Sequence, residues 1–334
     1  MHPVEIVGGG LAGLGLGIAL RTRGVPVTIR ETGHYPRHRV CGEFITSLDR
    51  TTRETLQLDA VLDRALPARG VTWCEDKKDA ISHQLSPPAL CVSRHVLDQE
   101  MASTFLRLGG ELRTGARGEC EDSPGRVLAC GRRPRSSSRW VGVKQHFRHL
   151  DLRNDLEVHF GRRGYIGLTR INRETVNVCG LLPRGSCDLH GSFTAMAGQA
   201  GFVDLSERLA GAEPVAGSFC AVAGLDYNDT APDDSFRVGD RSALIPPFTG
   251  HGMTIALQSA TTALDPLLAW ARGESEWEQA KASARRRQSR RFGWRVRTAR
   301  ALHPILLDAR ARGFARTLHR RGLLPVGLLY RVMH

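Results

Sequence analysis

Gly8, Gly10 and Gly13 have the spacing of a turn that receives a phosphate group. In a G-x-G-x-x-G turn the first glycine permits a tight bend, the second lets the backbone approach a pyrophosphate, and the third lets a helix pack closely on a strand. The free amides at the start of that helix attract the anion. Glu31 follows where a second strand should end, and a carboxylate there accepts hydrogen bonds from ribose hydroxyls and repels a 2′-phosphate. These four residues predict a site for FAD or NAD rather than NADP.

Hydrophobic patterning predicts the elements that position this turn. An apolar strand is expected at residues 4–7, followed by a helix that carries Leu16 and Leu20. Val27 and Ile29 alternate as strand residues do and lead into the acidic residue. The segment therefore predicts a β-α-β unit with the glycines in its first turn, since a glycine-rich turn that binds nothing would not need the carboxylate.

Helical and strand-like segments alternate further along the chain. A loop rich in Arg and His and an irregular stretch run to about residue 88, and a helix is expected from Arg94 to a Gly-Gly stop. A short strand ending near residue 131 and a strand-rich segment from about 140 to 224 follow. Gly239 and Asp240 should then end a strand, and a long helix should open after a Pro-Pro loop.

These motifs, in this order, resemble the flavoprotein superfamily of p-hydroxybenzoate hydroxylase, geranylgeranyl reductases and flavin-dependent halogenases over roughly residues 4–270. The stretches VCGEF, WVGVKQHF, GYIGL, VNVCGLL and IPPFTGHGM are similar to flavoproteins associated with bacterial type III polyketide synthases. The resemblance implies an α/β fold with a Rossmann-like FAD-binding domain and an inserted strand-rich substrate domain. The FAD-binding domain would comprise residues 1–70, 88–135 and 225–290, the substrate domain 71–87 and 136–224, and a basic helical segment 291–334.

The resemblance also implies contacts to FAD. Asp240 should hydrogen-bond the ribityl chain, unless it only caps a turn. The backbone amides of Gly250, Gly252 and Met253, at a helix N-terminus, should face the N1 and O2 edge of the flavin, where negative charge develops on reduction. Arg94 should reach the cofactor from the start of its helix, the alternative being a surface charge.

A loop and two titratable residues should lie near the flavin ring. Arg39 and the loop from Cys41 to Glu43 should lie over the cofactor, although Arg37 or His38 could take the place of Arg39. His251 titrates near neutral pH and could relay a proton, or it could face solvent without a chemical role. Cys41 is a further candidate proton donor, by analogy with the reductases.

The predicted substrate domain supplies three candidate contacts and one departure from the family. Lys144 and His146 alternate on a strand and so point to one face, where they could contact substrate or cap the sheet edge. Tyr165 keeps the first aromatic residue of the family's substrate-domain motif, but Gly167 replaces the second, which argues against halogenation.

A second departure concerns the reductant. Cys130 replaces the Asp of the Asp-Gly pair that hydroxylases associate with cofactor and nicotinamide binding, which leaves open whether electrons come from a nicotinamide at all.

Composition limits the class of protein. A chain of 334 residues with 41% hydrophobic residues can form two packed domains. Its eight cysteines lack C-x-x-C pairs and zinc spacing, so we expect no metal site and a reducing cytoplasm. The first strand begins at once, which leaves no room for a signal peptide and also favours a cytoplasmic location.

The charge of +13 lies in the C-terminal segment, because residues 281–334 hold 15 Lys or Arg and one acid, Asp308. A helix is expected there with an apolar and a cationic stripe. The apolar stripe consists of Leu307, Ala311, Phe314 and Leu318, and the cationic stripe of Arg312, Arg316 and Arg320. Such a helix either packs on the FAD domain or contacts the inner face of an anionic membrane, from which a lipidic substrate could be drawn. Regular aromatic spacing is missing, which argues against nucleic acid.

Three functions are consistent with these observations. The favoured one is an FAD-dependent monooxygenase that uses NADH or NADPH to hydroxylate an aromatic substrate, lipidic polyketides included. The alternative is a flavin-dependent reductase or dehydrogenase acting on a C=C bond of an isoprenoid or polyketide. A nucleic-acid-binding flavoprotein is the remote third.

Overall fold

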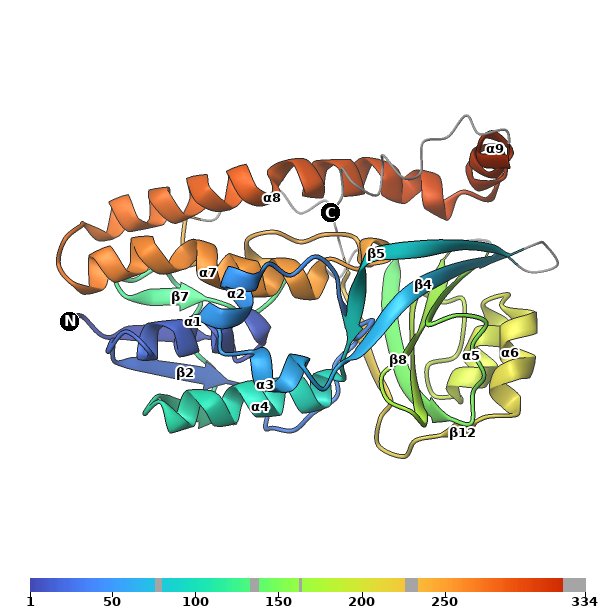
Figure 1. The fold of residues 1–334 in the computed structure, drawn as a ribbon, viewed down its shortest axis with the longest axis horizontal. Helices are drawn as coiled ribbons and strands as arrows, with labels where there is room; N and C mark the ends of the chain where they lie inside the picture. The colour runs from blue at the N-terminus through green and yellow to red at the C-terminus, as the bar shows by residue number, and fades with distance from the viewer. Residues whose placement is uncertain (76–79, 133–137, 162–163, 226–233, 321–334) are drawn as a thin grey trace.

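The computed structural model describes residues 1–75, 80–132, 138–161, 164–225 and 234–320. Within these residues the chain forms one parallel and one mixed β-sheet, with helices packed on both (Figure 1). The predicted α/β class is confirmed.

The parallel sheet has the strand order β14-β7-β1-β2-β6, and each neighbouring pair in it is parallel. Its strands are β1 (Val4–Val7), β2 (Val27–Glu31), β6 (Glu111–Thr114), β7 (Arg126–Leu128) and β14 (Phe236–Arg237). Its main helices are α1 (Leu11–Arg21), α4 (Arg94–Arg107) and α7 (Gly252–Ala271). Helix α1 packs against both α4 and α7, and its residues from Leu11 to Leu20 are all buried. This enclosure explains why α1 is apolar on every side.

The mixed sheet has the order β12-β8-β11-β10-β9-β4-β5-β3, with β13 paired to β8. Its strands are β3 (Phe44–Ile45), β4 (Leu66–Glu75), β5 (Ile81–Cys91), β8 (Trp140–Arg148), β9 (Leu156–Phe160), β10 (Tyr165–Arg170), β11 (Thr175–Pro183), β12 (Glu213–Pro214) and β13 (Cys220–Ala223). One face of this sheet forms an apolar core with α5 (Phe193–Gln199) and α6 (Val203–Ala210). The opposite face is therefore left for side chains that meet the parallel-sheet half of the molecule.

In its described residues, the stretch expected to be irregular up to residue 88 has regular secondary structure, so that prediction was wrong. It contains the short helices α2 (Arg50–Thr55) and α3 (Asp59–Leu62) and the long hairpin of β4 and β5. Pro67 in β4 and Pro87 and Pro88 in β5 weaken the strand signal, because proline cannot donate to a sheet ladder.

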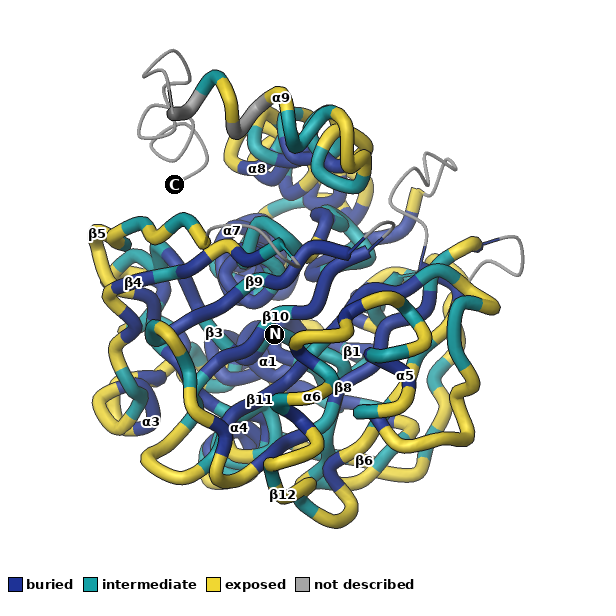
Figure 2. The backbone as a smooth tube through the Cα atoms, turned by 90° about the vertical axis from the view of Figure 1, so that its right-hand side faces the viewer, coloured by how far each residue is buried: buried dark blue, intermediate teal, exposed yellow. Residues whose placement is uncertain are grey.

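Helix α8 (Trp277–Leu307) packs on α7 and runs across the molecule to α9 (Ala309–Arg320) near the mixed sheet (Figure 1). Figure 2 shows α8 and α9 along one side of the molecule, with exposed residues on their outward side. Phe314 is 67% exposed, which contradicts the packing of its side chain on the FAD domain, and the Arg312 side chain of the predicted cationic stripe is buried against Glu75. The side chains of Arg316 and Arg320 lie outside the described residues. Glu75, a half-buried acid at the end of β4 that periodicity cannot reveal, pairs with Arg312 at 2.8 Å.

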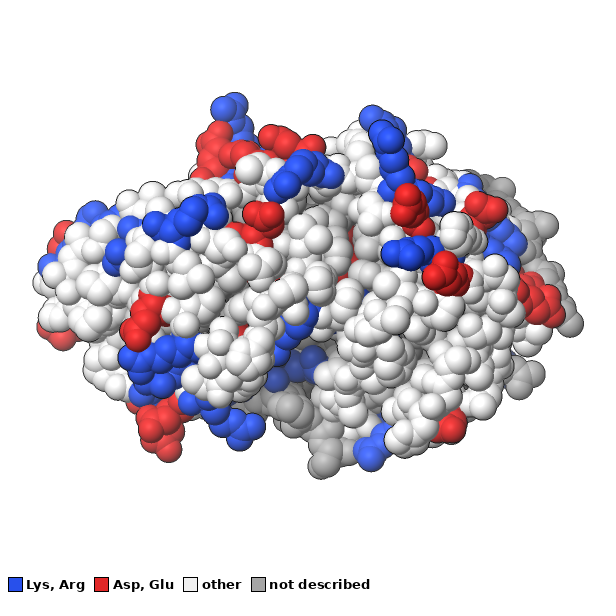
Figure 3. Space-filling model, turned by 90° about the horizontal axis from the view of Figure 1, so that it is seen from below, with Lys and Arg blue, Asp and Glu red and all other residues white. Residues whose placement is uncertain are grey.

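Surface charge and hydropathy add two observations. On the face seen from below, acidic and basic side chains are interspersed, and basic side chains lie at the hollow between the two halves (Figure 3). Among the helices of the described residues, none is long and apolar enough to cross a membrane.

Candidate functional site

The glycine turn joins β1 to α1, and two of its predicted glycines are required by the fold itself. Gly8 has φ +111°, and a Cβ there would lie 2.4 Å from the carbonyl oxygen of Ala129. A Cβ on Gly13 would lie 1.9 Å from the carbonyl oxygen of Gly8. Gly10 differs, because it precedes α1 with an ordinary φ of −86° and a Cβ there would meet nothing within 4 Å. The protein itself therefore leaves room beside the helix N-terminus at Gly10.

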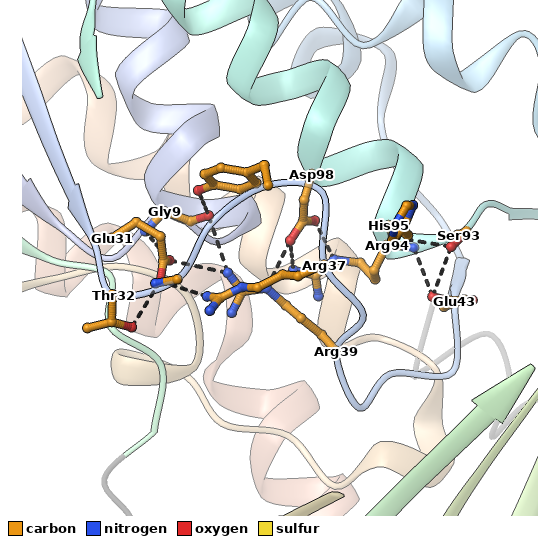
Figure 4. A network of polar contacts seen from close by, with 12 residues as sticks. Gly9, Glu31, Thr32, Arg37, Arg39, Glu43, Ser93, Arg94, His95 and Asp98 are labelled. Atoms are coloured by element: carbon orange, nitrogen blue, oxygen red, sulfur yellow. Dashed lines mark hydrogen bonds and ion pairs between the residues drawn. The ribbon is translucent and has the colours of Figure 1, made fainter. Parts of the chain in front are cut away.

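Glu31 ends β2 as predicted, and its carboxylate is almost fully buried. It accepts hydrogen bonds from the backbone amides of Gly9 and Gly33, both at 2.9 Å, and from Arg37 at 2.7 Å and Arg39 at 3.2 Å (Figure 4). Burial raises the pKa of this carboxyl, but the Gly33 amide and the two guanidinium groups outweigh burial and hold the pKa below 4.5. Glu31 is thus a fixed anion beside the glycine turn.

Arg39 and Arg94 meet at the buried carboxylate of Asp98. Arg94 donates to both Asp98 oxygens at 2.6 and 2.7 Å, and the Arg39 Nε donates to Oδ2 at 3.0 Å. Arg94 is not a surface charge, since its side chain is 11% exposed. Arg39 reaches Glu31 as well, so the network connects the glycine turn to the start of α4.

Glu43 joins the loop after Cys41 to both halves of the molecule. Its backbone has φ +60°, and its side chain is fully buried. The carboxylate accepts hydrogen bonds from the Arg94 amide at 2.9 Å and from the Ser93 hydroxyl at 3.2 Å at the start of α4. On the other side it meets His146 Nε2 at 2.7 Å and Lys144 Nζ at 3.4 Å, both from β8. Glu43 therefore connects the two sheets, and a strained backbone at such a point is typical of functional sites.

Lys144 and His146 lie on one face of β8, as their alternation predicted, and both are buried. They do not cap a sheet edge, because β8 pairs with β11 on one side and with β12 and β13 on the other. The Lys144 ammonium also donates to His38 Nδ1 at 2.9 Å. Burial first, and then the charge of Lys144, lowers the pKa of His38 to about 4, so this ring is neutral and can accept that bond.

The same sheet face carries further polar groups and one opening. Cys179 and Cys220 flank Lys144 on the neighbouring strands, and Asn177 donates to the carbonyl oxygen of Cys41 at 3.0 Å. A Cβ on Gly167 of β10 would meet only backbone oxygens, at 3.8 Å. Tyr165 of the same strand packs in a cluster with Phe160, Leu181 and Phe248.

The Cys41 thiol lies next to the Arg94 side chain and accepts a contact from the Glu43 amide at 3.4 Å. Burial raises the pKa of this thiol more than the Arg94 charge lowers it. Cys41 is therefore protonated at neutral pH.

Asp240 lies in a short 3-10 helix, η1 (Gly239–Arg241), directly against α1. Gly239 has φ +65°, and a Cβ there would lie 2.8 Å from the Cβ of Ala12. Burial raises the pKa of Asp240 above 3.8 in spite of the charges of Arg132 and Arg94.

The start of α7 repeats the arrangement seen at α1. Gly250 has φ +70°, and a Cβ there would lie 2.3 Å from the ring of Phe44, so the fold requires glycine. A Cβ on Gly252, the first residue of α7, would meet nothing within 4 Å. Met253 is buried in the core beside it. Two helix N-termini, at Gly10 and Gly252, therefore have open space where most residues would place a side chain.

His251 is completely buried, which contradicts the solvent-facing alternative. Its Nδ1 lies 2.8 Å from the carbonyl oxygen of Thr249. Because a carbonyl oxygen only accepts, Nδ1 carries a proton, and Nε2 is the ring position that gains or loses one.

The sequence placed Glu43 only in the loop expected over the cofactor, with no role for its side chain, and gave Asp98 no role at all. In the sequence each of the two is only an acid near an arginine. Glu43 binds the amide of Arg94 and Asp98 binds Arg39, both more than 50 positions away, whereas the Arg94 side chain reaches Asp98 from one turn earlier in the same helix.

Two groups of side chains lie at distances that suit a metal ion: His38, Glu43 and His146, and separately Cys74, Glu157 and His159. In each group the carboxylate already binds a cation, Lys144 or Arg208, which disfavours a divalent ion.

No protein-family model matches the sequence, and no curated protein matches it. Solved structures match over nearly the whole chain. The flavin-dependent brominase Bmp2 has a TM-score of 0.75 and 17% identity over 99% of this chain and 93% of that chain. PqsL of Pseudomonas aeruginosa, in complex with 2-aminobenzoylacetate, has a TM-score of 0.70 and 16% identity over 92% and 97%. A geranylgeranyl bacteriochlorophyll reductase-like protein of Thermoplasma acidophilum has a TM-score of 0.71 and 15% identity over 91% and 87%.

These matches confirm the predicted resemblance at the level of fold and leave the polyketide synthase association untested. The chain has the fold of the flavoproteins that include FAD-dependent halogenases, FAD-dependent monooxygenases such as PqsL and geranylgeranyl reductase-like proteins.

Proposed function

We propose that the protein is an FAD-dependent oxidoreductase, specifically an NADH- or NADPH-dependent monooxygenase that hydroxylates an aromatic substrate, with lipidic polyketides in the substrate class. The observation that carries the proposal is the pair of open positions at Gly10 and Gly252, which neither packing nor backbone angle requires to be glycine. They lie at the N-termini of two helices that pack together, with the half-buried Asp240 on η1, which contacts both helices.

The residues around these openings fit FAD. The pyrophosphate would bind at the α1 N-terminus beside Gly10, where free amides and the helix dipole favour an anion. Glu31 would hold the adenosine ribose, exchanging part of its bonding with Arg37 and Arg39 for ribose hydroxyls. Asp240 would accept hydrogen bonds from the ribityl chain, and the amides from Gly250 to Met253 would face the pyrimidine edge of the flavin. When bound, FAD supplies the two-electron chemistry and the activation of oxygen.

The chain's own residues would position the substrate and move protons. We propose that the polar face of the mixed sheet, with His146, Lys144 and Tyr165, forms the substrate side of the site, and that the opening at Gly167 admits an aromatic ring. Lys144 and Glu43 neutralise each other there and hold the Cys41 loop against the sheet. His251 would exchange a proton through Nε2 while its Nδ1 stays bound to the carbonyl of Thr249.

The protonated Cys41 thiol favours a second candidate function. A buried thiol that stays protonated at neutral pH can donate a proton to a carbon atom after hydride transfer. This would suit a reductase or dehydrogenase acting on a C=C bond of an isoprenoid or polyketide. Oxygen dependence separates the two functions.

The cofactor proposal is tested by a pair of glycine variants. Gly10→Ala should keep the fold, because its Cβ meets no protein atom, and should lose FAD affinity by at least about tenfold if the pyrophosphate occupies that space. Gly13→Ala is the matched variant, and its clash with the Gly8 carbonyl should destabilise the fold itself. Full FAD affinity in folded Gly10→Ala would remove the basis of the proposal.

The reaction is tested by mixing the FAD-loaded protein anaerobically with NADH or NADPH and then adding oxygen, with and without a phenolic lipid. A monooxygenase incorporates an atom of isotope-labelled oxygen into the phenol. Turnover of substrate that persists without oxygen would favour the reductase and exclude the monooxygenase.

We also propose peripheral contact between helix α8 and an anionic membrane, as a route for lipidic substrates. The outward side of α8 exposes Arg286, Arg290 and Arg297 together with Trp294, which is 62% exposed. Arginines beside an exposed tryptophan suit the headgroup region of a bilayer. The exposed Phe314 of α9 adds a second apolar side chain near the end of α8.

A further inference from the structure

Cys120 lies in the loop before β7 and Cys130 lies just after β7, yet their side chains lie side by side. Their sulfur atoms are 4.0 Å apart, and they are ten positions apart in the chain. A disulfide needs the sulfurs to approach to about 2 Å, so both side chains must rotate toward each other when the bond forms. Among the eight cysteines these two are the exposed ones, whereas the other six are buried or half-buried.

The loop that carries Cys120 is held in place on both sides of it. Glu119 pairs with Arg126 at 3.1 Å, and Asp122 pairs with Lys281 of α8 at 2.5 Å. The Arg126 guanidinium also donates to the carbonyl oxygen of Glu121 at 3.3 Å. These contacts fix the direction of the loop, so the approach of the two thiols follows from the fold.

Cys130 connects this pair to the proposed phosphate turn. A Cβ on Gly8 would lie 2.7 Å from the Cys130 amide nitrogen, so the backbones of the turn and of Cys130 are in contact. The guanidinium of Arg241 of η1 also lies near the Cys130 thiol. The pair therefore lies directly against the glycine turn.

We propose that Cys120 and Cys130 form a reversible dithiol–disulfide pair that joins the loop 116–125 to the glycine turn. With hydrogen peroxide as oxidant, one thiol takes up oxygen to give a sulfenic acid and releases water. The second thiol then attacks that sulfur, which forms the S–S bond and releases a second water. Two thiols lose two electrons and two protons, and peroxide is reduced to two waters.

The test uses the full chain and needs no flavin chemistry, so it succeeds or fails independently of the proposed function. The reduced protein is treated with equimolar hydrogen peroxide, unfolded, alkylated with N-ethylmaleimide and digested with trypsin. Cleavage at Arg117, Arg126 and Arg132 places the two cysteines in separate peptides, GECEDSPGR and VLACGR. We expect these peptides to be joined, the number of alkylated thiols to fall from eight to six, and dithiothreitol to restore all eight.

Three variants make the result specific. Cys120→Ser and Cys130→Ser should each abolish the joined peptides, whereas Cys187→Ser, outside the pair, should leave them unchanged. The proposal is overturned if both peptides are recovered separately alkylated or separately over-oxidised. It is equally overturned if peroxide joins Cys120 of one molecule to Cys120 of another.

Discussion

Replacing Glu43 by glutamine should destabilise the protein more than its single charge suggests. The side chains of Glu43 and Lys144 are both 0% exposed, so water cannot compensate the ammonium when the carboxylate is gone. Removal of one member of a buried pair costs about 3–5 kcal/mol. Glutamine still offers an oxygen to the Arg94 amide and to Ser93, so we take the lower end, about 3 kcal/mol.

The assay is urea unfolding of Glu43→Gln, of Lys144→Met and of the double variant at neutral pH. Removing both charges leaves no buried ion, so the double variant should cost less than the sum of the single variants by about 1.5 kcal/mol or more. Glu213→Gln is the matched control, because the Arg148–Glu213 pair is 3.9 Å long and about half exposed; we expect a change below about 0.5 kcal/mol there. A loss below about 1 kcal/mol for Glu43→Gln, or simple additivity, would refute the reasoning.

The pH dependence follows from the sign of the Glu43 shift. Burial by itself raises the pKa of this carboxyl, but the hydrogen bond from His146 and the charge of Lys144 hold the pKa below 4.5. A carboxyl with a lowered pKa in the folded state stabilises the fold above its ordinary value, and this contribution is lost as the pH falls through the lowered value. The difference between the wild type and Glu43→Gln should therefore be constant near neutral pH and shrink below pH 4.5.

Asp240→Ala should give a folded protein that loses FAD on desalting, because the predicted ribityl acceptor is gone; absorbance of the desalted protein checks this, and retained yellow colour would contradict it. His251→Ala should slow flavin reduction or product formation by about tenfold to a hundredfold and remove one ionisation from the pH–rate profile. An unchanged profile would retire the proton relay. The wild type should sediment with anionic but not neutral liposomes at low salt, since three arginines contribute about 3 kcal/mol. Trp294→Ala and Arg290→Gln should weaken this binding, whereas equal recovery of all forms in the supernatant, or preference for DNA at the same salt, would reject the membrane proposal.

Local patterns predicted the elements around the cofactor site well. Alternation, together with a glycine spacing that is typical of nucleotide-binding turns, predicted strand β1, the end of β2 at Glu31 and the start of α7 at Gly252. The reason is that a phosphate-binding turn is built from adjacent residues, so a short stretch of sequence determines its geometry.

Interactions between distant segments could not be predicted in the same way. The alternation of Lys144 and His146 predicted that they share one face of a strand. Their partner Glu43 is about a hundred positions away in the chain, and only the packing of the two halves of the molecule brings it to that face. Arg312 is a second example. Hydrophobicity placed this arginine on the outer side of its helix, but its ion pair with Glu75 and its stacking on Phe160 turn it inward. Which side of a surface helix is buried depends on the residues that it packs against.

The order of strands in the parallel sheet has a consequence for synthesis on the ribosome. Its edge strand β14 begins at Phe236, whereas its partner β7 ends at Leu128. Of the mixed sheet, strands β3 to β5 precede α4, β6 and β7, and strands β8 to β13 lie between β7 and β14. The mixed sheet, with all its strands between residues 44 and 223, can pair before the parallel sheet is complete. Asp240 and the start of α7 emerge later still, and α8 must then close over α7. A nascent chain therefore holds a half-built form of the proposed cofactor site until about three quarters of it has been translated, and chaperone binding during that interval would act on the apolar surface that α7 later covers.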